Sequence, residues 1–359
     1  MRRGCAGGRL ARMSMRALTS LLLLAIAAAG LAQEAPAEDP ALAELRAQSA
    51  RLTPLVSSEL AREFLQATAG LPAVTPRRVL AAADRSRWFT PEQAEALPAD
   101  ERAALTERTL DSAFYWNTRY GTPLAYARAL DLAAAHGLSA EGAAIVDFGC
   151  GGLGAARLLA GCGASVTGVD VDPLLPAFYS RPGDQGEVLR GEGRAPGRVA
   201  LVMGRWPAEN AAVVAVDAAA PQGLDLFLSK NTLKHGYVHP AQEVDPRMLV
   251  RLGVDDAAFV EAVAGRLRPG GLFLIYNLCP APAPEGQPYI PWADGRCPFA
   301  RDLLERAGLE VLAFDQVDDA AARASGVALG WDQGDGAMDL QNDLFAWFTL
   351  ARRPADRSK

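Results

Sequence analysis

One short stretch constrains this chain more than any other: an apolar run that ends in a cluster of glycines and is followed by an acidic residue. Residues 144–154 read Ala-Ile-Val-Asp-Phe-Gly-Cys-Gly-Gly-Leu-Gly, and Asp170 follows sixteen residues after the last glycine. The pattern predicts a strand, a glycine turn, a helix and a second strand that ends in a carboxylate. Glycines let the backbone approach a ligand closely, and the helix start offers it free N–H groups. Because a carboxylate at the tip of the next parallel strand accepts hydrogen bonds from ribose hydroxyls, the stretch predicts a site for a nucleoside-containing cofactor.

The glycine spacing alone leaves the cofactor open. Gly149, Gly151 and Gly154 also satisfy the dinucleotide pattern G-x-G-x-x-G, which is a weak indication when it stands alone. Asp147, however, stands two residues before Gly149. This is the place of the acidic residue that opens the first motif of the class I S-adenosylmethionine-dependent methyltransferases, whereas dinucleotide folds usually have an apolar residue there. The segment therefore resembles the methyltransferase family.

Four further segments agree with this resemblance, in the order in which the family has them. Residues 225–235 look like its fourth motif, a strand that begins with Asp and a loop that ends in Leu-x-His. Residues 267–275 resemble its helix end, Pro-Gly-Gly turn and fifth strand, and residues 307–311 and 344–350 resemble its sixth and seventh strands. The resemblance covers about residues 140–353. It implies an α/β fold, a Rossmann-like doubly wound sheet of seven mostly parallel strands with an antiparallel last strand, preceded by a helical N-terminal segment.

The resemblance also implies S-adenosylmethionine as the cofactor, and it indicates which residues bind it. These residues are Asp147, Gly149, Cys150, Gly151, Gly154, Asp170, Val171, Met203 and Ser229. One position departs from the family pattern. After the third strand the family commonly has an acidic residue that contacts the adenine amino group, and this chain has Arg205 there. Met203 and Trp206 remain candidates to sandwich the adenine ring.

The loop after the fourth strand has the most unusual composition of the chain. Only three lysines and three histidines occur beside 33 arginines, and two of each fall between residues 229 and 240. Lysine has a compact charge and an adjustable pKa, and histidine titrates near neutrality. We therefore interpret His235, Lys230 and Asn231 as catalytic candidates that hold the acceptor or take its proton. The alternative for His235 is that it only packs under the following helix.

Aromatic residues mark the candidate substrate side. Residues 114–123 are unusually aromatic, and the loop from Cys279 to Phe299 follows the fifth strand, where these enzymes usually build acceptor pockets. The candidates are Tyr115, Tyr120, Tyr237, Tyr289 and Trp292, with Arg119 and Asp294 beside them. Ordinary packing of helices and anchoring of a long loop explain the same residues equally well. The stretch 180–198, rich in Gly, Arg and Asp, is interpreted as an inserted surface loop.

The N-terminus has the form of a secretory signal peptide. Arg12 and Arg16 precede an uncharged stretch, residues 17–32, with four consecutive leucines and a small-residue end. Sixteen residues are short for a stable membrane span. We expect a signal peptide at 1–32, a linker at 33–41, a helical segment without strands at 42–140 on the lid or substrate side, a methyltransferase domain at 141–353 and a tail at 354–359. A functional signal places the protein in the periplasm or outside the cell, where S-adenosylmethionine is not normally expected; without one the protein is cytoplasmic.

Composition narrows the function further. The chain has a formal net charge of −6, and the part beyond residue 32 carries −11 because the first 32 residues hold five arginines and no acid. An acidic chain without a basic stripe argues against nucleic acid as the partner and favours a small-molecule acceptor. No metal-ligand spacing stands out. Cys279 and Cys297 bracket a Pro-rich loop, and in an oxidising compartment a disulfide between them is one possibility and two free thiols the other.

The sequence thus predicts an S-adenosylmethionine-dependent enzyme that methylates a small molecule. Two rivals stay open at this point. One is an exported binding module that keeps the fold without catalysis, which the signal segment and Arg205 suggest. The other is an NAD(P)-dependent oxidoreductase, which the glycine spacing suggests.

Overall fold

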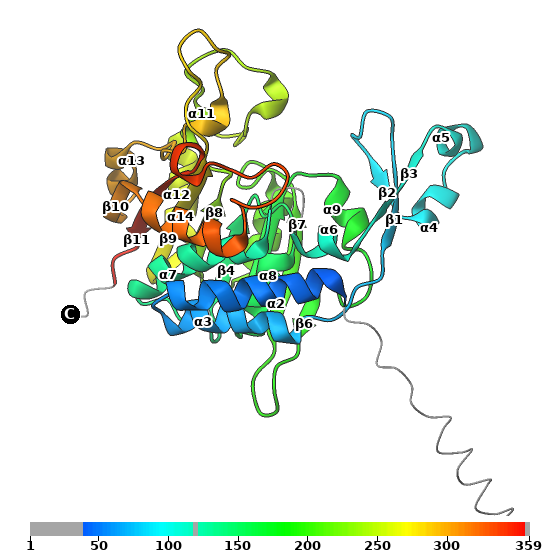
Figure 1. Ribbon diagram of the computed structural model, residues 1–359, viewed down its shortest axis with the longest axis horizontal. Helices are drawn as coiled ribbons and strands as arrows, with labels where there is room; N and C mark the ends of the chain where they lie inside the picture. Colours follow the sequence, from blue (N-terminus) through cyan, green and yellow to red (C-terminus); the bar gives the residue numbers. More distant parts are fainter. Residues whose placement is uncertain (1–38, 118–120, 356–359) are drawn as a thin grey trace, which may run out of the picture. The chain divides into compact units, whose positions relative to one another are not determined.

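A mixed sheet of eight strands is the centre of the computed structural model, which describes residues 39–117 and 121–355 (Figure 1). The strands lie in the order β10-β11-β9-β8-β4-β5-β7-β6. Their bounds are β4 Ala144–Phe148, β5 Ser165–Asp170, β6 Gly186–Val188, β7 Gly197–Met203, β8 Leu224–Lys230, β9 Leu267–Cys279, β10 Glu310–Val317 and β11 Phe345–Arg352. Strands β7, β5, β4, β8 and β9 run parallel to one another, whereas β11 is antiparallel to both β9 and β10.

This order confirms the predicted fold class. Strands β7-β5-β4-β8-β9 have the doubly wound order 3-2-1-4-5, with the chain reversing its direction of growth between β4 and β8. The antiparallel β11, inserted between β9 and β10, is the predicted antiparallel last strand. The eighth strand, β6, lies in the stretch interpreted as a surface loop and pairs antiparallel with the edge strand β7. With three residues and flanking glycines, it carries no alternation that a sequence pattern can detect.

The sheet separates two hydrophobic cores. Because side chains alternate along a strand, Leu226 and Leu228 of β8 enter one core, whereas Phe227 between them enters the other. Strand β9 repeats this alternation. The second core also holds side chains of α10, α12 and α13. The helices that follow β4 in the chain are α8 Gly154–Gly161, α9 Leu174–Phe178, α10 Asn210–Ala219, α11 His235–Val238, α12 Asp256–Arg266, α13 Arg301–Arg306, α14 Asp319–Leu329 and α15 Leu340–Asp343.

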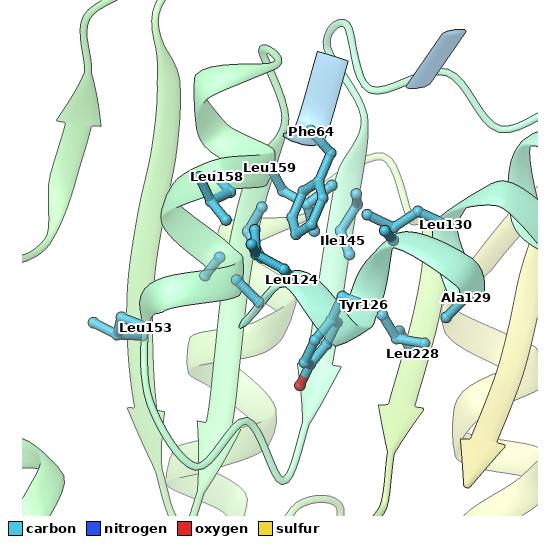
Figure 2. Packing of buried hydrophobic residues seen from close by; sticks show 14 of the residues in the cluster. Phe64, Leu124, Tyr126, Ala129, Leu130, Ile145, Leu153, Leu158, Leu159 and Leu228 are labelled. Atoms are coloured by element: carbon cyan, nitrogen blue, oxygen red, sulfur yellow. The ribbon is translucent and has the colours of Figure 1, made fainter. Parts of the chain in front are cut away.

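Helices from the N-terminal segment cover the face of the sheet that carries Leu226 and Leu228. The segment contains α2 Pro40–Leu52, α3 Glu59–Gln66, α4 Pro91–Glu95, α5 Ala99–Ala103, α6 Ser112–Asn117 and α7 Ala127–Ala135. Figure 2 shows Phe64 of α3 packed beside Leu158 and Leu159 of α8 and Ile145 of β4. The N-terminal segment therefore shares its core with the sheet.

The structure also has short 3₁₀ turns: η1 Thr53–Leu55, η2 Ala67–Gly70, η3 Pro123–Tyr126, η4 Pro246–Met248 and η5 Pro291–Ala293.

The expectation that residues 42–140 lack strands is wrong. Strands β1 Arg77–Ala81, β2 Trp88–Phe89 and β3 Thr106–Leu110 form a small antiparallel sheet in the order β2-β1-β3. Its strands are short, and β3, Thr-Glu-Arg-Thr-Leu, is exposed along nearly its whole length. Short, charged strands held by cross-strand pairs such as Arg78 with Glu107 lack the apolar alternation by which a strand is identified in a sequence.

Several expectations concern residues that the structure does not describe. The predicted signal peptide at 1–32, most of the linker and Tyr120 with Arg119 lie outside the described residues. Within 39–117 and 121–355, no helix has both the length and the apolar character needed to cross a membrane. The proposed boundary between residues 140 and 141 stays a prediction.

Replacing Phe64 with Ala tests whether the N-terminal helices belong to the core of the sheet. Phe64 is fully buried, so its removal leaves a cavity and is expected to lower the free energy of unfolding by about 3–5 kcal/mol. Urea unfolding followed by circular dichroism measures the change. Leu189→Ala is the control, since Leu189 is 83% exposed and its loss is expected to cost less than about 0.5 kcal/mol. A cost for Phe64→Ala as small as the control's would contradict the shared core.

Candidate functional site

The glycine turn after β4 forms one wall of the site. Gly149 and Gly151 have positive φ angles of 71° and 61°, which non-glycine residues rarely adopt. Close packing reinforces this requirement, because a β-carbon on Gly149 would overlap the side chain of Thr232. The Thr232 hydroxyl donates a hydrogen bond of 3.1 Å to the carbonyl oxygen of Gly149. The turn is thus held against the loop that follows β8.

Asp170 at the end of β5 faces the same turn. One carboxylate oxygen accepts the N–H of Gly151 at 2.7 Å, and the other accepts the N–H groups of Val171 at 2.7 Å and Asp172 at 2.9 Å. These bonds fix the orientation of the carboxylate. Because a carboxylate oxygen can accept more than one hydrogen bond, the arrangement retains capacity for hydroxyl donors of a ligand.

A cavity of about 740 Å³ opens between the turn, the end of β5 and the loop after β8. It lies at the carboxyl ends of the parallel strands, beside the point where the strand order reverses, which is where open α/β sheets bind ligands. Its volume lies within the range of about 300–1,000 Å³ that is usual for cofactor and small-molecule pockets. Among the predicted site residues, those that line it are Gly149, Cys150, Gly151, Gly154, Asp170, Val171, Trp206, Lys230, Asn231, Tyr237 and Trp292.

Asp147 lies beneath this wall and is buried. One of its carboxyl oxygens accepts the Tyr126 hydroxyl at 3.2 Å, and the other has no hydrogen-bond partner among the described residues. Burial raises the pKa of Asp147 from 3.8 to about 7, against the lowering effect of the Tyr126 hydrogen bond. In Figure 2 the hydroxyl of Tyr126 points away from the packed leucines around it. Asp147 therefore holds an unused acceptor oxygen one layer below the cavity.

Two lysines, one at the end of β8 and one in the loop after it, are also buried and line the cavity. Lys230 is 9% exposed and Lys234 is 4% exposed. Burial lowers the pKa of each ammonium from 10.5 to about 8, and for Lys230 the repulsion from Lys234 adds to this effect. The Lys234 ammonium donates to the carbonyl oxygens of Leu278 at 2.5 Å and Trp292 at 3.2 Å. Burial also raises the pKa of the Cys150 thiol, which makes this cysteine a poor nucleophile.

Other residues of this loop take structural roles. Ser229 is fully buried and its hydroxyl accepts the N–H of Leu233 at 3.1 Å, so it does not line the cavity. Asn231 has a left-handed φ of 64° and its side-chain oxygen accepts the N–H of Leu278 at 2.7 Å. His235 lies outside the lining residues, with its Nδ1 at 3.0 Å from a carboxylate oxygen of Asp294. His235 is the first residue of α11 and stays partly exposed, so the structure places it outside the cavity lining beside Asp294 and not beneath the helix.

Three other predicted residues lie away from the cavity. Tyr115 is buried among aromatic rings, and its hydroxyl donates to Asp184 at 2.9 Å, so it is a packing residue. Met203 is half-buried and packs against the core on the α8 side of the sheet. The Tyr289 hydroxyl accepts the N–H of Ala241 at 3.3 Å and anchors the loop. In each case the residue type suits a ligand, but packing positions it elsewhere.

Cys279 and Cys297 are free thiols in this structure, which leaves the two-thiol alternative. Cys279 lies at the end of β9, 3.7 Å from the carbonyl oxygen of Phe345, and Cys297 is buried in the second core. The two cysteines that bracket the loop therefore occupy different surroundings.

One wall of the cavity, residues 246–251, was not predicted from the sequence. This segment begins with η4, and Val250 donates a backbone hydrogen bond of 3.0 Å to the carbonyl oxygen of Tyr237. The only signal in the sequence is Arg247 and Arg251 on either side of an apolar triplet, which is too short to be assigned to a site. Trp116 and Tyr126 also line the cavity and were not predicted, although Trp116 lies within the aromatic run at 114–123 and Tyr126 lies just after it.

Comparisons with known proteins found matches among solved structures. No protein-family model and no curated protein matches the sequence. Among solved structures, the chain is similar to an S-adenosylmethionine-dependent methyltransferase from Mesorhizobium loti, with 20% identity over 64% of this chain and 98% of the other and a TM-score of 0.35. It is also similar to phosphoethanolamine N-methyltransferase 2 from Haemonchus contortus, with 12% identity over 83% and 75% and a TM-score of 0.38. A third match is the [4+2]-cyclase SpnF, with 16% identity over 67% and 83% and a TM-score of 0.37.

The fold assignment rests on the sheet itself. A doubly wound parallel sheet with an antiparallel strand between its last two parallel strands is the fold of the class I S-adenosylmethionine-dependent methyltransferases. The six-stranded dinucleotide-binding order has a parallel strand at that place. The chain therefore has the methyltransferase fold, with an added edge strand and an N-terminal segment that packs on one face.

Asp147→Asn is expected to stabilise the protein in a pH-dependent way. Because the native carboxyl keeps its proton up to about pH 7, whereas the unfolded one loses it near its ordinary pKa of 3.8, stability is lost as pH rises across this window. Asn cannot ionise and avoids that loss. The gain in unfolding free energy should be larger at pH 8 than at pH 4.5 by about 1–3 kcal/mol.

Urea unfolding at the two pH values measures this difference. Asp332→Asn, which changes an exposed carboxylate of a loop, serves as the control. Equal effects of Asp147→Asn at both pH values would show that ionisation of Asp147 does not change between them.

Proposed function

We propose that this protein is an enzyme that transfers a methyl group from S-adenosylmethionine to a small-molecule acceptor. The observation that carries the proposal is the cavity at the switch point of the sheet, where the glycine turn, Asp170 and Lys230 face one space. The residues fit this cofactor on three counts: a turn that admits no β-carbon at Gly149, a carboxylate oriented by backbone N–H groups, and the unpartnered buried oxygen of Asp147.

The residues divide the cavity into a cofactor half and an acceptor half. We assign Gly149, Gly151, Asp170 and Val171 to the cofactor, with Asp170 receiving the ribose hydroxyls. The sulfonium of S-adenosylmethionine supplies an electrophilic methyl group when it is bound. The protein then has to align an acceptor, exclude water and, for a hydroxyl or ammonium acceptor, remove a proton. We assign the acceptor half to Lys230, Tyr237 and Trp292.

Lys230 is the proposed electrostatic orienter of the acceptor. Its pKa of about 8 keeps most of the side chain charged near pH 7, so its ammonium can hold a polar group of the acceptor. Its place at the end of β8 puts it on the lining of the cavity, whereas His235 lies outside it. Asn231 supports the lysine by fixing the turn that follows it, through its bond to Leu278.

We further propose export through residues 1–32, on the pattern of charge, apolar run and small residues alone. A fusion of residues 1–40 to a reporter that is active only after export should be active, and Leu22→Arg with Leu23→Arg should abolish its activity because the apolar run is interrupted. Mass spectrometry should find a mature N-terminus near Gln33. A chain recovered from the cytoplasm with its N-terminus intact would refute export and leave the methyl-transfer proposal untouched.

Calorimetric titration with S-adenosylmethionine and S-adenosylhomocysteine tests the cofactor site. Wild-type protein should bind both, and Asp170→Ala should weaken each by about 10–100-fold, the value of a charge-assisted hydrogen bond. Asp170→Asn keeps the shape and removes the charge, so it separates loss of charge from disturbance of the turn.

Asp302→Ala, which removes an exposed carboxylate of α13, is the matched control and should bind as the wild type does. A folded protein that binds neither compound would refute the proposed function. Binding of NADH with enhanced fluorescence would instead support the oxidoreductase alternative.

A further inference from the structure

The lining of the cavity is unevenly charged. Its acidic residues, Asp170 and Asp172, lie at the end of β5 on the cofactor half. Its basic residues lie on the other side, in the loops after β7 and β8 and in residues 246–251: Arg205, Lys230, Lys234, Arg247 and Arg251. A basic half in a chain whose net charge is −6 is not explained by general composition.

Lys230 is the innermost of these cations. It is the last residue of β8 and continues the row of Leu226 and Leu228, because alternate residues of a strand share a face. Its ammonium lies 5.3 Å from the centre of the Tyr126 ring and makes no hydrogen bond or ion pair within the described part of the chain. The buried carboxyl of Asp147 attracts it at longer range, but this carboxyl keeps its proton up to about pH 7. A side chain that is 91% buried, charged and without a hydrogen-bond acceptor faces a ligand space that can supply one.

Lys234 adds a second donor nearby. Two carbonyl oxygens hold its ammonium in place, and an ammonium has three hydrogens to donate, so one remains for a ligand. At the mouth of the cavity, Arg251 makes no ion pair with any described residue, whereas Arg247 pairs with Asp245 and Arg205 with Glu209. The free positive charge is therefore concentrated on Lys230, Lys234 and Arg251.

We infer that the methyl acceptor carries a carboxylate or a phosphate, which Lys230 and Lys234 bind in the cavity. An anion there supplies the hydrogen-bond acceptor that Lys230 lacks and offsets the cost of burying two ammonium groups. Arg251 at the mouth attracts the same charge from solution. The inference rests on the proposed methyl transfer and specifies its substrate class.

The small number of lysines makes a direct test possible. The full chain is labelled with ¹³C at the Cε atoms of its three lysines, and Lys230→Met, Lys234→Met and Lys359→Met each remove one signal and so assign it. Protein saturated with S-adenosylhomocysteine is then titrated with inorganic phosphate and, separately, with acetate. The Lys230 signal should shift saturably with at least one anion. Its pKa should rise by one unit or more, because a bound anion favours the charged form.

The anion that shifts the Lys230 signal identifies the anionic group of the acceptor. A shift with phosphate alone identifies a phosphate acceptor, and a shift with acetate alone identifies a carboxylate. Lys230→Met should weaken anion binding at least tenfold and leave the affinity for S-adenosylhomocysteine within twofold of wild type, whereas Lys359→Met should change neither.

Three results separate failure of this inference from failure of the proposed function. No saturable shift with either anion overturns the anionic acceptor. A Lys230 pKa that rises on addition of S-adenosylhomocysteine alone, with no further response to anions, also overturns it, because Lys230 then binds the carboxylate of the cofactor. Absence of S-adenosylhomocysteine binding to wild-type protein refutes the proposed function itself.

Discussion

The close approach of three chain segments at the glycine turn is the constraint on which the site depends. Gly149 lies against Thr232 from the loop after β8, and Gly154, where α8 begins, lies against the carbonyl oxygen of Trp116 in α6. A β-carbon at either position would overlap its neighbour. The turn thus positions Asp170 through the N–H of Gly151, the lysine loop through Thr232 and the N-terminal segment through Trp116. Larger side chains at these glycines would push Asp170, the lysine loop and the N-terminal segment away from the turn. The positions of the cavity walls therefore depend on one another.

The part of this arrangement that could be predicted from the sequence is the part whose signal is local. Strand β4, the turn and Asp170 follow one another within a short stretch of the chain, and the buried strands carry apolar runs that set the order of elements. Strands β1, β2, β3 and β6 are each only two to five residues long, and β1 and β3 pair across an intervening segment that holds two helices. Residues 246–251 line the cavity and are tied to α11 by the hydrogen bond from Val250 to Tyr237. A local sequence pattern does not indicate contacts between segments that are distant in the chain, so these elements were not predicted.

For single residues, the sequence did not predict the direction in which each side chain points. The composition of residues 229–235 identified the right loop, but the side chains there point to different places. Lys230 enters the cavity, Ser229 points to the opposite face of β8, and the left-handed backbone at Asn231 redirects the chain so that His235 pairs with Asp294. A shift of one residue along the strand turns a side chain to the opposite face, and a sequence motif does not specify that position.

The choice of lysine in a chain rich in arginine follows from what burial costs. Arginine keeps its charge at any ordinary pH, so a buried arginine without an anion bears the full desolvation penalty. Lysine can release its proton, which limits the penalty to the lowering of its pKa from 10.5 to about 8 for Lys230 and Lys234. For Asp147 the shift is in the opposite direction, because burial raises its pKa and the carboxyl keeps its proton up to about pH 7. Burial of these groups therefore costs less because they can approach neutrality, and the same groups become charged when a ligand of opposite charge reaches them.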